Sequence, residues 1–499
     1  MHTIVEIKGT RSGYRCGYCG VSRGKVSYGM WSHTMTVQDY QDLLDRGWRR
    51  SGKYVYKPIM NKTCCPQYTI RCHALKFQPS KSHKKILKKM NKFLFVGEIP
   101  EGQCDGEPMD SVCHESGPAR DSSQLSASEV EGPINPPDVD KGAETNSAAP
   151  EPPRQEAGPP ANAKATRSAP IPGVGADPSR PPCRKAKELR KERRMQKEQR
   201  RQQEAGDTAT SSSSSSVPAP APAPAPTTAN QTKSLEEFLS ETTPDSPLHR
   251  LEVRLVPVSF EDPEFVATYE RSAALYSKYQ QAIHGDDPSE CGETEYKRFL
   301  CDSPLEVETA ADGPELGYGS FHQQYWLDGR LIAVGVIDVL PSCVSSVYLY
   351  YHPDFSNLSL GVYSALREIA FTRQLQKQSP KLCHYYLGFY IHSCPKMRYK
   401  GQYLPSDLLC PETFTWVPIE QCVPRLDASA YARLNQDGQA VDTRALRELG
   451  RALVLFRRTV MPYAAYTRKC KGSGDEPEVE QYAQLVGQPC AERILLYRA

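Results

Sequence analysis

The chain has 499 residues, of which 38% are hydrophobic and 42 are proline, and its formal net charge is +3. This length suits two or three domains, and the low apolar share with many prolines indicates that a large part is unfolded. No stretch approaches the roughly 20 apolar residues that cross a bilayer, and the first residues lack the form of a signal peptide. We therefore expect no membrane partner, a cytoplasmic and nuclear location, and 17 cysteines that are reduced or metal-bound.

The first region, residues 1–103, is basic and rich in cysteine and aromatic residues. Residues 1–100 hold 19 Lys and Arg against 5 Asp and Glu, which favours a polyanion such as RNA, although a solvated basic face has the same composition. The pattern predicts a helix that begins after Thr36 and stops at Gly47, a hairpin over 48–56 that turns at Ser51-Gly52, and a helix over 82–94.

Four cysteines in this region have the spacing of a metal site. Cys16 and Cys19 form a C-x-x-C pair, and Cys64 and Cys65 follow as a second pair. Adjacent ligands need a turn between them, which Pro66 supplies. Four thiolates can hold zinc or an iron–sulfur cluster, and the sequence does not choose between them; buried or redox-active thiols are the alternative. Two Cys-Pro pairs, at Cys394 and Cys410, are a weak haem signal and are expected to be core cysteines.

The second region, residues 104–245, has the composition of a disordered linker. It contains a serine run at 211–216 and an Ala-Pro alternation at 218–226, which cannot bury enough apolar surface to offset chain entropy. A basic run at 184–201 carries 10 Lys and Arg with 3 Glu. A nuclear import signal, an RNA contact and a solvated tail remain open for this run.

The third region, residues 246–499, predicts an α+β fold. Strands over 321–327 and 331–340 are joined by Asp328-Gly329, and a third strand covers 345–351. Ser359 is the expected cap of a helix over 360–375, and a strand over 384–392 follows. An antiparallel run followed by strand–helix–strand is the order of a GNAT-like acyltransferase core, with a mixed, mostly antiparallel sheet and covering helices.

Two groups of motifs stand in a fixed order along the chain. The first consists of Tyr14-Arg-Cys-Gly-Tyr-Cys19, Gly29-Met-Trp31, Met35-Thr-Val-Gln-Asp-Tyr40, Arg46-Gly-Trp-Arg-Arg-Ser-Gly52 and Cys64-Cys-Pro-Gln-Tyr68. The second consists of Tyr279-Gln-Gln-Ala-Ile-His284, Gly319-Ser-Phe-His-Gln-Gln-Tyr325, Asp338, Ser345-Ser-Val-Tyr-Leu-Tyr-Tyr351, Leu358-Ser-Leu-Gly-Val-Tyr363 and Gly388-Phe-Tyr-Ile-His-Ser-Cys-Pro-Lys-Met-Arg-Tyr-Lys400. Over residues 14–95 and 250–420, this combination resembles the eukaryotic arginyl-tRNA–protein transferases.

The resemblance implies a function, a fold and a cofactor. The expected enzyme transfers arginine from arginyl-tRNA to the N-terminal α-amine of proteins that begin with Asp, Glu or oxidised Cys, and so marks them for ubiquitin-dependent degradation in the N-degron pathway. In this family the paired cysteines bind zinc or an iron–sulfur cluster, and the catalytic half is GNAT-like. The ester donor is already activated, so neither ATP nor CoA is expected. The oligomeric state is left open.

The chemistry of the two substrates selects candidate residues for the catalytic site. The arginyl guanidinium needs a carboxylate, for which Asp338 in an apolar strand is the first choice, ahead of Glu295 and Glu368; a structural salt bridge is the alternative. Aromatic rings that can stack on the terminal adenosine are Tyr348, Tyr350 and Tyr390, which are otherwise core residues. Histidines that can transfer a proton are His284 and His322.

Further candidates concern the acceptor and the RNA. Lys396, Arg398 and Lys400 alternate, so that on a strand they would share one face and bind an acidic acceptor or tRNA phosphates. Ser359 and Gly361 begin a helix after a strand, where a substrate group can bind. The expected tRNA contacts are Arg49, Arg50, Lys84, Lys85, Lys88 and Lys89.

Two other functions stay open on the sequence alone. One is a CoA-dependent N-acetyltransferase with the same fold, although Leu360 stands where a CoA-binding loop would be rich in glycine. The other is a non-catalytic adaptor that binds zinc or RNA. One fold hosts many reactions, so the fold does not separate these functions.

Overall fold

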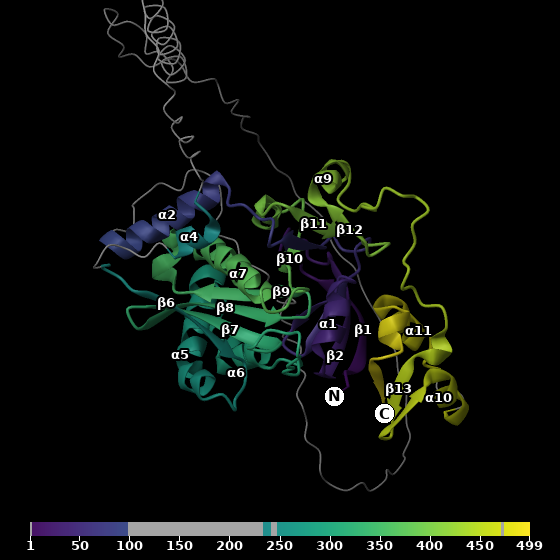
Figure 1. Cartoon of the computed structure of the whole chain (residues 1–499). Helices are drawn as coiled ribbons and strands as arrows, with labels where there is room; N and C mark the ends of the chain where they lie inside the picture. The colour runs from purple at the N-terminus through teal and green to yellow at the C-terminus, as the bar shows by residue number, and fades with distance from the viewer. Residues whose placement is uncertain (1, 98–232, 241–246, 471–473) are drawn as a thin grey trace, which may run out of the picture. The chain divides into compact units, whose positions relative to one another are not determined.

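The computed structural model describes residues 2–97, 233–240, 247–470 and 474–499, which belong to one compact unit with two β-sheets (Figure 1). The first sheet has the order β14-β13-β15-β1-β2-β4-β3. Its strands are β1 (Ile4–Tyr14), β2 (Lys25–Thr34), β3 (Arg49–Ser51), β4 (Tyr54–Pro58), β13 (Leu453–Phe456), β14 (Thr459–Pro462) and β15 (Leu495–Arg498).

The second sheet has the order β12-β11-β5-β10-β9-β8-β7-β6. Its strands are β5 (Tyr68–His73), β6 (Leu251–Pro257), β7 (Gly319–Leu327), β8 (Arg330–Val339), β9 (Cys343–Tyr351), β10 (His384–Tyr390), β11 (Ser406–Leu409) and β12 (Trp416–Pro418). Strands β6 to β9 form an antiparallel meander, and β10 then pairs parallel to β9. The predicted α+β fold with mostly antiparallel strands is confirmed.

Helices lie on both faces of the second sheet, and α10 and α11 contact strands of the first. They are α1 (Val37–Leu44), α2 (Lys81–Val96), α4 (Leu235–Leu239), α5 (Pro263–Tyr279), α6 (Glu293–Tyr296), α7 (Leu360–Gln376), α8 (Pro395–Arg398), α9 (Ile419–Ala428), α10 (Tyr463–Lys469), α11 (Glu476–Val486) and α12 (Gln488–Ala491). Shorter 3₁₀ or π turns are η1 (Gln280–His284), η2 (Pro288–Glu290), η3 (Lys297–Cys301), η4 (Pro353–Leu358), η5 (Tyr399–Gln402) and η6 (Leu449–Arg451). Figure 1 shows α2, α4 and α7 on one side of strands β7 to β9 and α5 with α6 on the other. No helix in the described ranges is both long and apolar enough to cross a bilayer.

Local sequence signals account for most of these elements. The Thr36 hydroxyl accepts the Asp39 amide at 3.1 Å and starts α1, as predicted. The hairpin of β3 and β4 and the helix α2 also lie where the pattern places them. Asp328 and Gly329 have φ angles of 50° and 80°, as the tight turn between β7 and β8 requires.

The expected division into separate N-terminal and C-terminal domains differs from the structure. Strand β5, at residues 68–73, lies between β10 and β11 of the second sheet, and β15 pairs with β1 of the first. Both sheets therefore combine strands from regions 1–103 and 246–499. Hydrophobic alternation predicts a strand but does not say which sheet it joins, so the sequence could not reveal this exchange.

Most of the expected linker, including the basic run at 184–201, lies outside the described residues. Its end differs from the expectation, because residues 235–239 form α4. Ser234 and Glu237 cap this helix reciprocally, and Leu235 and Phe238 are buried in the core. An apolar pair behind a capping box was enough to fix one helical turn against α2 and α7.

A buried ion pair joins β3 to β8 across the two regions. The Arg50 guanidinium donates to both carboxylate oxygens of Asp338, at 2.6 and 2.9 Å, and to the Ser320 hydroxyl at 3.0 Å. Asp338 has no exposed side-chain surface, and the Arg50 side chain is 2% exposed. A bidentate pair with a further hydrogen bond compensates charges that would otherwise be costly to bury.

Replacing Asp338 by Ala should lower the free energy of unfolding by about 3–5 kcal/mol, because the Arg50 charge would remain buried without a partner. Urea denaturation measures this change. The double variant Arg50→Met/Asp338→Leu should recover much of the loss, since it removes both charges. Arg254→Ala, in an exposed pair with Glu252, is the control and should change stability little. A single variant as stable as the wild type would contradict the role of this pair.

Candidate active site and metal centre

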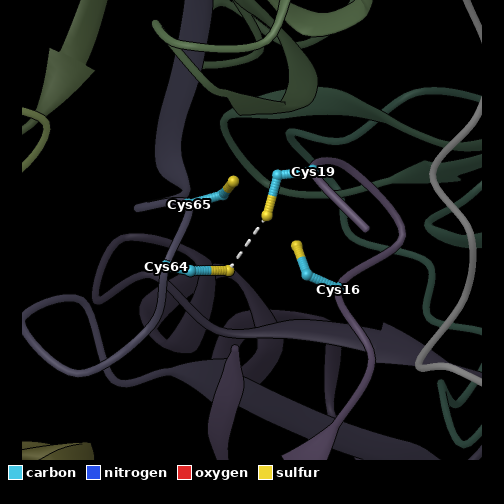
Figure 2. A group of neighbouring side chains, drawn as sticks. All are labelled: Cys16, Cys19, Cys64 and Cys65. Carbon is cyan, nitrogen blue, oxygen red and sulfur yellow. Dashed lines mark hydrogen bonds between the residues drawn. The ribbon is translucent and has the colours of Figure 1, made fainter. Parts of the chain in front are cut away.

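The four predicted cysteine ligands converge on one point (Figure 2). The sulfurs of Cys16, Cys19, Cys64 and Cys65 all lie within 4.8 Å of one another, and Cys19 and Cys64 are 3.4 Å apart. A tetrahedral zinc ion with Zn–S bonds of about 2.3 Å holds its sulfurs about 3.8 Å apart. The cluster therefore fits a single ion of this kind with a small contraction.

Two loops carry these ligands and are hydrogen-bonded to each other. The loop between β1 and β2 turns tightly, with the Cys16 amide donating to the Val21 carbonyl at 2.9 Å. The Cys64 amide donates to the Gly24 carbonyl at 2.8 Å. A side chain at Gly24 would overlap the Cys64 sulfur, so glycine is required for this approach.

The thiols differ in their readiness to ionise. The Val21 amide donates to Cys19 and lowers its pKa to about 7, in spite of partial desolvation. Burial, together with neighbouring thiols, raises the pKa of Cys64 to about 12. Lys25 lies near Cys16; burial lowers the Lys25 pKa to about 8, and the Cys16 charge opposes that shift. A nearby cation offsets part of the negative charge that four thiolates bring together.

A crevice opens between β9 and β10 in the second sheet. These parallel strands pair over only three positions, from His384 with Cys343 to Tyr386 with Ser345, and then separate. The space between them, together with the first turns of α7, forms a small cavity of about 40 Å³ that is open to solvent. Its lining comes from β9, β10, α7 and η5, and the polar members are Ser346, Tyr348, Ser364, Tyr385, Tyr399 and Lys400.

A bulge in β10 accompanies this separation. Gly388 has a φ angle of 74°, and the pairing of β10 with β5 shifts register between Tyr386 and Phe389. The Arg49 guanidinium donates to the Gly388 carbonyl at 3.0 Å and lies 5.3 Å from the centre of the Phe389 ring. Arg49, from the N-terminal region, thus fixes the bulge in β10 next to the point where β10 separates from β9.

Hydrogen bonds connect the crevice to groups around it. The Tyr348 hydroxyl accepts from the Gln280 amide at 2.7 Å and lies 3.4 Å from His284 Nε2, so that it can donate to His284. On the other wall, the Tyr385 hydroxyl donates to the Glu368 carboxylate at 2.6 Å. Two tyrosines of the lining therefore lead to an imidazole and to a buried carboxylate.

Several predicted residues reach the crevice and others do not. Gly361, Lys400 and Tyr348 line it, and His284 contacts it through Tyr348. Ser359 lies at the start of α7 with a φ angle of 55°, but its side chain forms no capping hydrogen bond with the helix.

The strand geometry that would bring Lys396, Arg398 and Lys400 onto one face does not occur, because this segment forms α8 and η5. Proline at the first helical position favours this outcome. In helical geometry Lys396, Arg398 and Lys400 do not share one face. Lys396 is exposed, Arg398 lies 3.5 Å from the Asp427 carboxylate, and only Lys400 lines the crevice.

Four further residues were predicted to contact a substrate or RNA, but in the structure they are buried away from the crevice and from the surface. Asp338 is fully paired with Arg50, and so neither is open to a substrate or to RNA. Arg49 is 4% exposed and bound to the Gly388 carbonyl, which removes it from the tRNA contacts. Tyr350 is fully buried and bonds to the Ser272 hydroxyl at 2.7 Å, within the ring cluster under α5. The sequence shows which residues are charged or aromatic, but it does not show which residues they contact in the fold.

The lysines of α2 form part of a basic surface. Lys85 and Lys88 are exposed, Lys84 and Lys89 are half-buried, and Lys89 donates to the Asn357 carbonyl in η4. At the start of η4, His352 Nε2 lies 2.8 Å from the Lys278 ammonium and 2.6 Å from the Arg330 guanidinium. Within the described ranges, neither cation forms an ion pair with a carboxylate. We call these six residues, Lys84, Lys85, Lys88, Lys89, Lys278 and Arg330, the basic surface.

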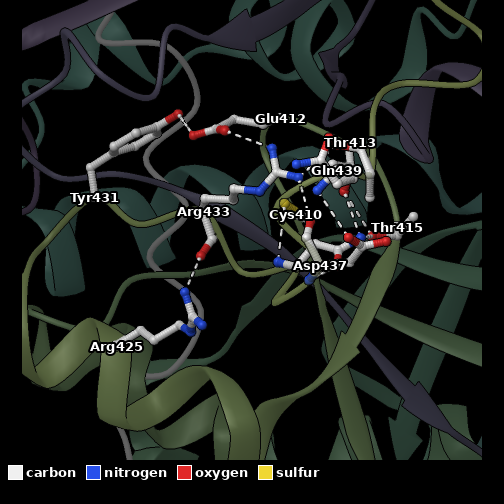
Figure 3. Close-up of polar contacts among 11 residues, drawn as sticks. Cys410, Glu412, Thr413, Thr415, Arg425, Tyr431, Arg433, Asp437 and Gln439 are labelled. Atoms are coloured by element: carbon white, nitrogen blue, oxygen red, sulfur yellow. Dashed lines mark hydrogen bonds and ion pairs between the residues drawn. The ribbon is translucent and has the colours of Figure 1, made fainter.

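Cys410 begins a polar network that holds the segment 410–440 together (Figure 3). Burial raises the Cys410 pKa, but hydrogen bonds from Thr413 and from nearby amides outweigh it, so that the pKa is lowered overall. Glu412 accepts from Tyr431 at 3.0 Å and from Arg433 at 3.2 Å. Cys410 and Cys394 are both buried, as expected of core cysteines.

Two family models and several relatives match the chain over the segments that carry the cysteine cluster and the crevice. Residues 14–85 match the model described as the N terminus of arginine-tRNA-protein transferase, and residues 271–410 match its C terminus. A protein from Drosophila melanogaster named arginyl-tRNA–protein transferase 1 is 42% identical over 99% of both chains. The chain belongs to the arginyl-tRNA–protein transferase family.

The chain is also similar to more distant proteins. The Arabidopsis thaliana protein named arginyl-tRNA–protein transferase 2 is 38% identical over 84% of this chain and 76% of its own. A Pseudomonas syringae protein named aspartate/glutamate leucyltransferase is 33% identical over 35% of this chain and 66% of its own. The family matches contain all four clustered cysteines and the crevice segments of β9, α7 and β10.

Replacing Cys65 by Ser should abolish stoichiometric metal binding, since a buried thiolate ligand is lost and a hydroxyl is a poor substitute. Metal content per chain, and sulfur-to-metal charge-transfer absorption after loading with Co²⁺, measure this loss. Cys383→Ser is the matched control, because Cys383 lies outside the cluster. Equal metal content in both variants would contradict the four-cysteine site.

Proposed function

We propose that this chain transfers arginine from arginyl-tRNA to the N-terminal α-amine of proteins that begin with Asp, Glu or oxidised Cys. The observation that carries the proposal is 42% identity over 99% of the chain to a protein named for this reaction. The products would enter ubiquitin-dependent degradation, and the cytosol and nucleus would be the setting. The acidic acceptors are supported by the name of the bacterial relative, an aspartate/glutamate leucyltransferase.

The order of elements in the second sheet supports a GNAT-like catalytic core. An antiparallel meander leads into β9, helix α7 follows, and β10 pairs parallel to β9 before the two strands part. Ligands of open α/β sheets bind where the direction of connection changes. The crevice occupies this position, so we place the reacting ends of both substrates in it.

The reaction needs little more than alignment of the substrates and movement of protons. The neutral acceptor amine attacks the ester carbonyl, a peptide bond forms, the ester C–O bond breaks, and the tRNA hydroxyl leaves with a proton. An α-amine has a pKa of about 8, so a modest base is sufficient to neutralise it. Tyr348, which can donate to His284, is the crevice group placed to relay the proton that the amine loses. Positioning supplies much of the remaining rate.

Lys400 is the cation best placed for the acidic side chain of the acceptor. It lines the crevice from η5 and is 5% exposed, so that a carboxylate bound beside it would be largely desolvated. Charge-assisted hydrogen bonds are strongest in such surroundings. Lys396 and Arg398, on the exposed side of α8, are assigned no direct role.

The basic surface would hold the tRNA backbone. Lys89 contacts η4, His352 begins η4, and the following helix α7 lines the crevice. Phosphates bound along α2 and η4 would therefore lead the acceptor end of the tRNA to the mouth of the crevice. Lys278 and Arg330 lie beside the same imidazole nitrogen and form no ion pair of their own in the described ranges, which favours a phosphate between them, although the Asp354 carboxylate lies 3.4 Å from the other ring nitrogen of His352.

Zinc is the metal that we propose for the four cysteines. Sulfurs within 4.8 Å suit one tetrahedral ion, whereas an iron–sulfur cluster binds its thiolates through separate irons and holds them farther apart. A closed Cys₄ site supplies folding energy rather than a reactive water. Here it would fix the loops that pack, through Cys16 and Cys65, against Phe389 and Met397.

The direct test incubates purified protein with radiolabelled arginyl-tRNA and peptides that begin with Asp, Glu or Ala. Label should enter the Asp and Glu peptides and not the Ala peptide, without ATP or CoA. Lys400→Met should lower kcat/KM for the Asp peptide roughly 10- to 100-fold through loss of one charged hydrogen bond. Transfer from acetyl-CoA, or tRNA binding without transfer, would instead favour an acetyltransferase or an adaptor.

A charge reversal tests the basic surface. Lys85→Glu/Lys88→Glu should weaken tRNA binding and reduce the slope of log affinity against log salt by about 2, one unit for each phosphate contact. Filter binding at several salt concentrations measures both effects. Lys381→Glu, an exposed lysine before β10, is the control. An unchanged slope in the double variant would remove α2 from the RNA interface.

A further inference from the structure

Glu368 lies under the crevice, one helical turn beyond its lining. Gly361, Ser364 and Ala365 of α7 line the crevice, and residue 368 continues the same face of the helix. Its carboxylate accepts from the Tyr385 hydroxyl at 2.6 Å and also interacts with the Ser346 side chain. Both of these residues line the crevice, so Glu368 is separated from it by only two hydroxyl-bearing side chains.

This carboxylate is buried without a counter-charge. Glu368 is 1% exposed, and no Lys, Arg or His in the described part of the chain forms an ion pair with it. The ionisable groups around it are Tyr385 on β10, Tyr325 on β7 and Arg367 on α7, whose guanidinium is bonded to the Tyr363 hydroxyl. The buried Asp338 is fully paired by comparison. An unpaired buried carboxylate is costly to keep, and such groups gather at functional sites.

We propose that Glu368 supplies the negative charge that selects the arginyl side chain of the donor, which would lie in the crevice against Ser346 and Tyr385 with its guanidinium toward Glu368. The proposal rests on the proposed function, because the cation it needs comes from arginyl-tRNA. It assigns the guanidinium subsite to the part of the crevice lined by Ser346 on β9 and Tyr385 on β10, whereas Lys400 lines the crevice from η5. The two substrates of the reaction carry opposite charges, and these two parts of the lining would match them.

The burial of Glu368 makes this selection depend on pH. Burial raises the Glu368 pKa to about 7, while hydrogen bonds from Tyr385 and Ser346 oppose that shift. The group is neutral below pH 7 and ionised above it, so the KM for an arginyl donor should fall as pH rises through 7. A guanidinium in the crevice would favour the ionised form and draw the proton off.

The test compares two donors that differ only in charge. One tRNA carries arginine, and the other carries citrulline, the neutral urea analogue of arginine. The wild type should prefer the arginyl donor, and Glu368→Gln should reduce that preference roughly 5- to 10-fold, less than the loss of a direct charged hydrogen bond, because the charge acts across the Tyr385 and Ser346 side chains. The pH dependence of the arginyl KM should flatten in the variant. If Glu368 had only a structural role, the substitution would lower kcat/KM equally for both donors and leave the preference unchanged. That result would overturn the proposal.

Stability gives a second readout, and Tyr385→Phe gives a matched variant. The folded-state pKa lies above the usual value, so the Glu368 charge lowers stability as pH rises between about 4.5 and 7. Glu368→Gln should therefore be at least as stable as the wild type at pH 8. Tyr385→Phe removes one hydrogen bond to the Glu368 carboxylate but keeps the charge. Because Tyr385 also lines the proposed subsite, transfer from both donors should slow, while the arginyl preference should fall less than in Glu368→Gln. If the wild type itself transfers no arginine, the proposed function fails; if it does and Glu368→Gln keeps the preference, only this inference fails.

Discussion

The buried pair of Arg50 and Asp338 is the constraint that holds the two regions of the chain in one fold. Both charges are out of water, and each has no partner of equal strength except the other. Separating β3 from β8 would expose one charge to an apolar interior or require both to be rehydrated, so partial docking of the N-terminal region is disfavoured. Its neighbour Arg49 then reaches the Gly388 carbonyl, and the bulge beside the crevice follows from the same placement.

The metal centre and the crevice belong to one connected structure. Cys16 and Cys65 pack with Phe389, Ile391 and Met397, at the end of β10 and in α8. The chain continues directly into η5, whose Tyr399 and Lys400 line the crevice. The four-cysteine cluster is therefore placed to hold η5, and with it one part of the crevice lining, in position. With a metal bound, the N-terminal cysteines would act on the crevice through packing and not through direct contact with its contents.

Sequence patterns predicted local structure well and long-range partners poorly. A capping signal located α1, a turn signal located the hairpin of β7 and β8, and the spacing of apolar residues located α2 and α7, because each depends on residues a few positions apart. The four cysteines converge as their spacing predicted, and Lys400, Gly361 and Tyr348 line the crevice, although their roles in substrate binding stay predictions. Asp338 was the first choice for binding the arginyl guanidinium but is paired with Arg50, since a carboxylate in an apolar strand looks the same in the sequence whether or not a distant arginine pairs with it. The insertion of β5 left no local signal at all.

The pairing of β15 with β1 bears on how the chain is made. Strand β1 lies between β15 and β2, and residues 495–498 are synthesised long after residues 4–14. Until they emerge from the ribosome, the outer edge of β1 has unsatisfied amide and carbonyl groups, which are open to pairing with other chains. This edge of β1, at Ile4 and Val5, is therefore completed only when the last residues of the chain have been made.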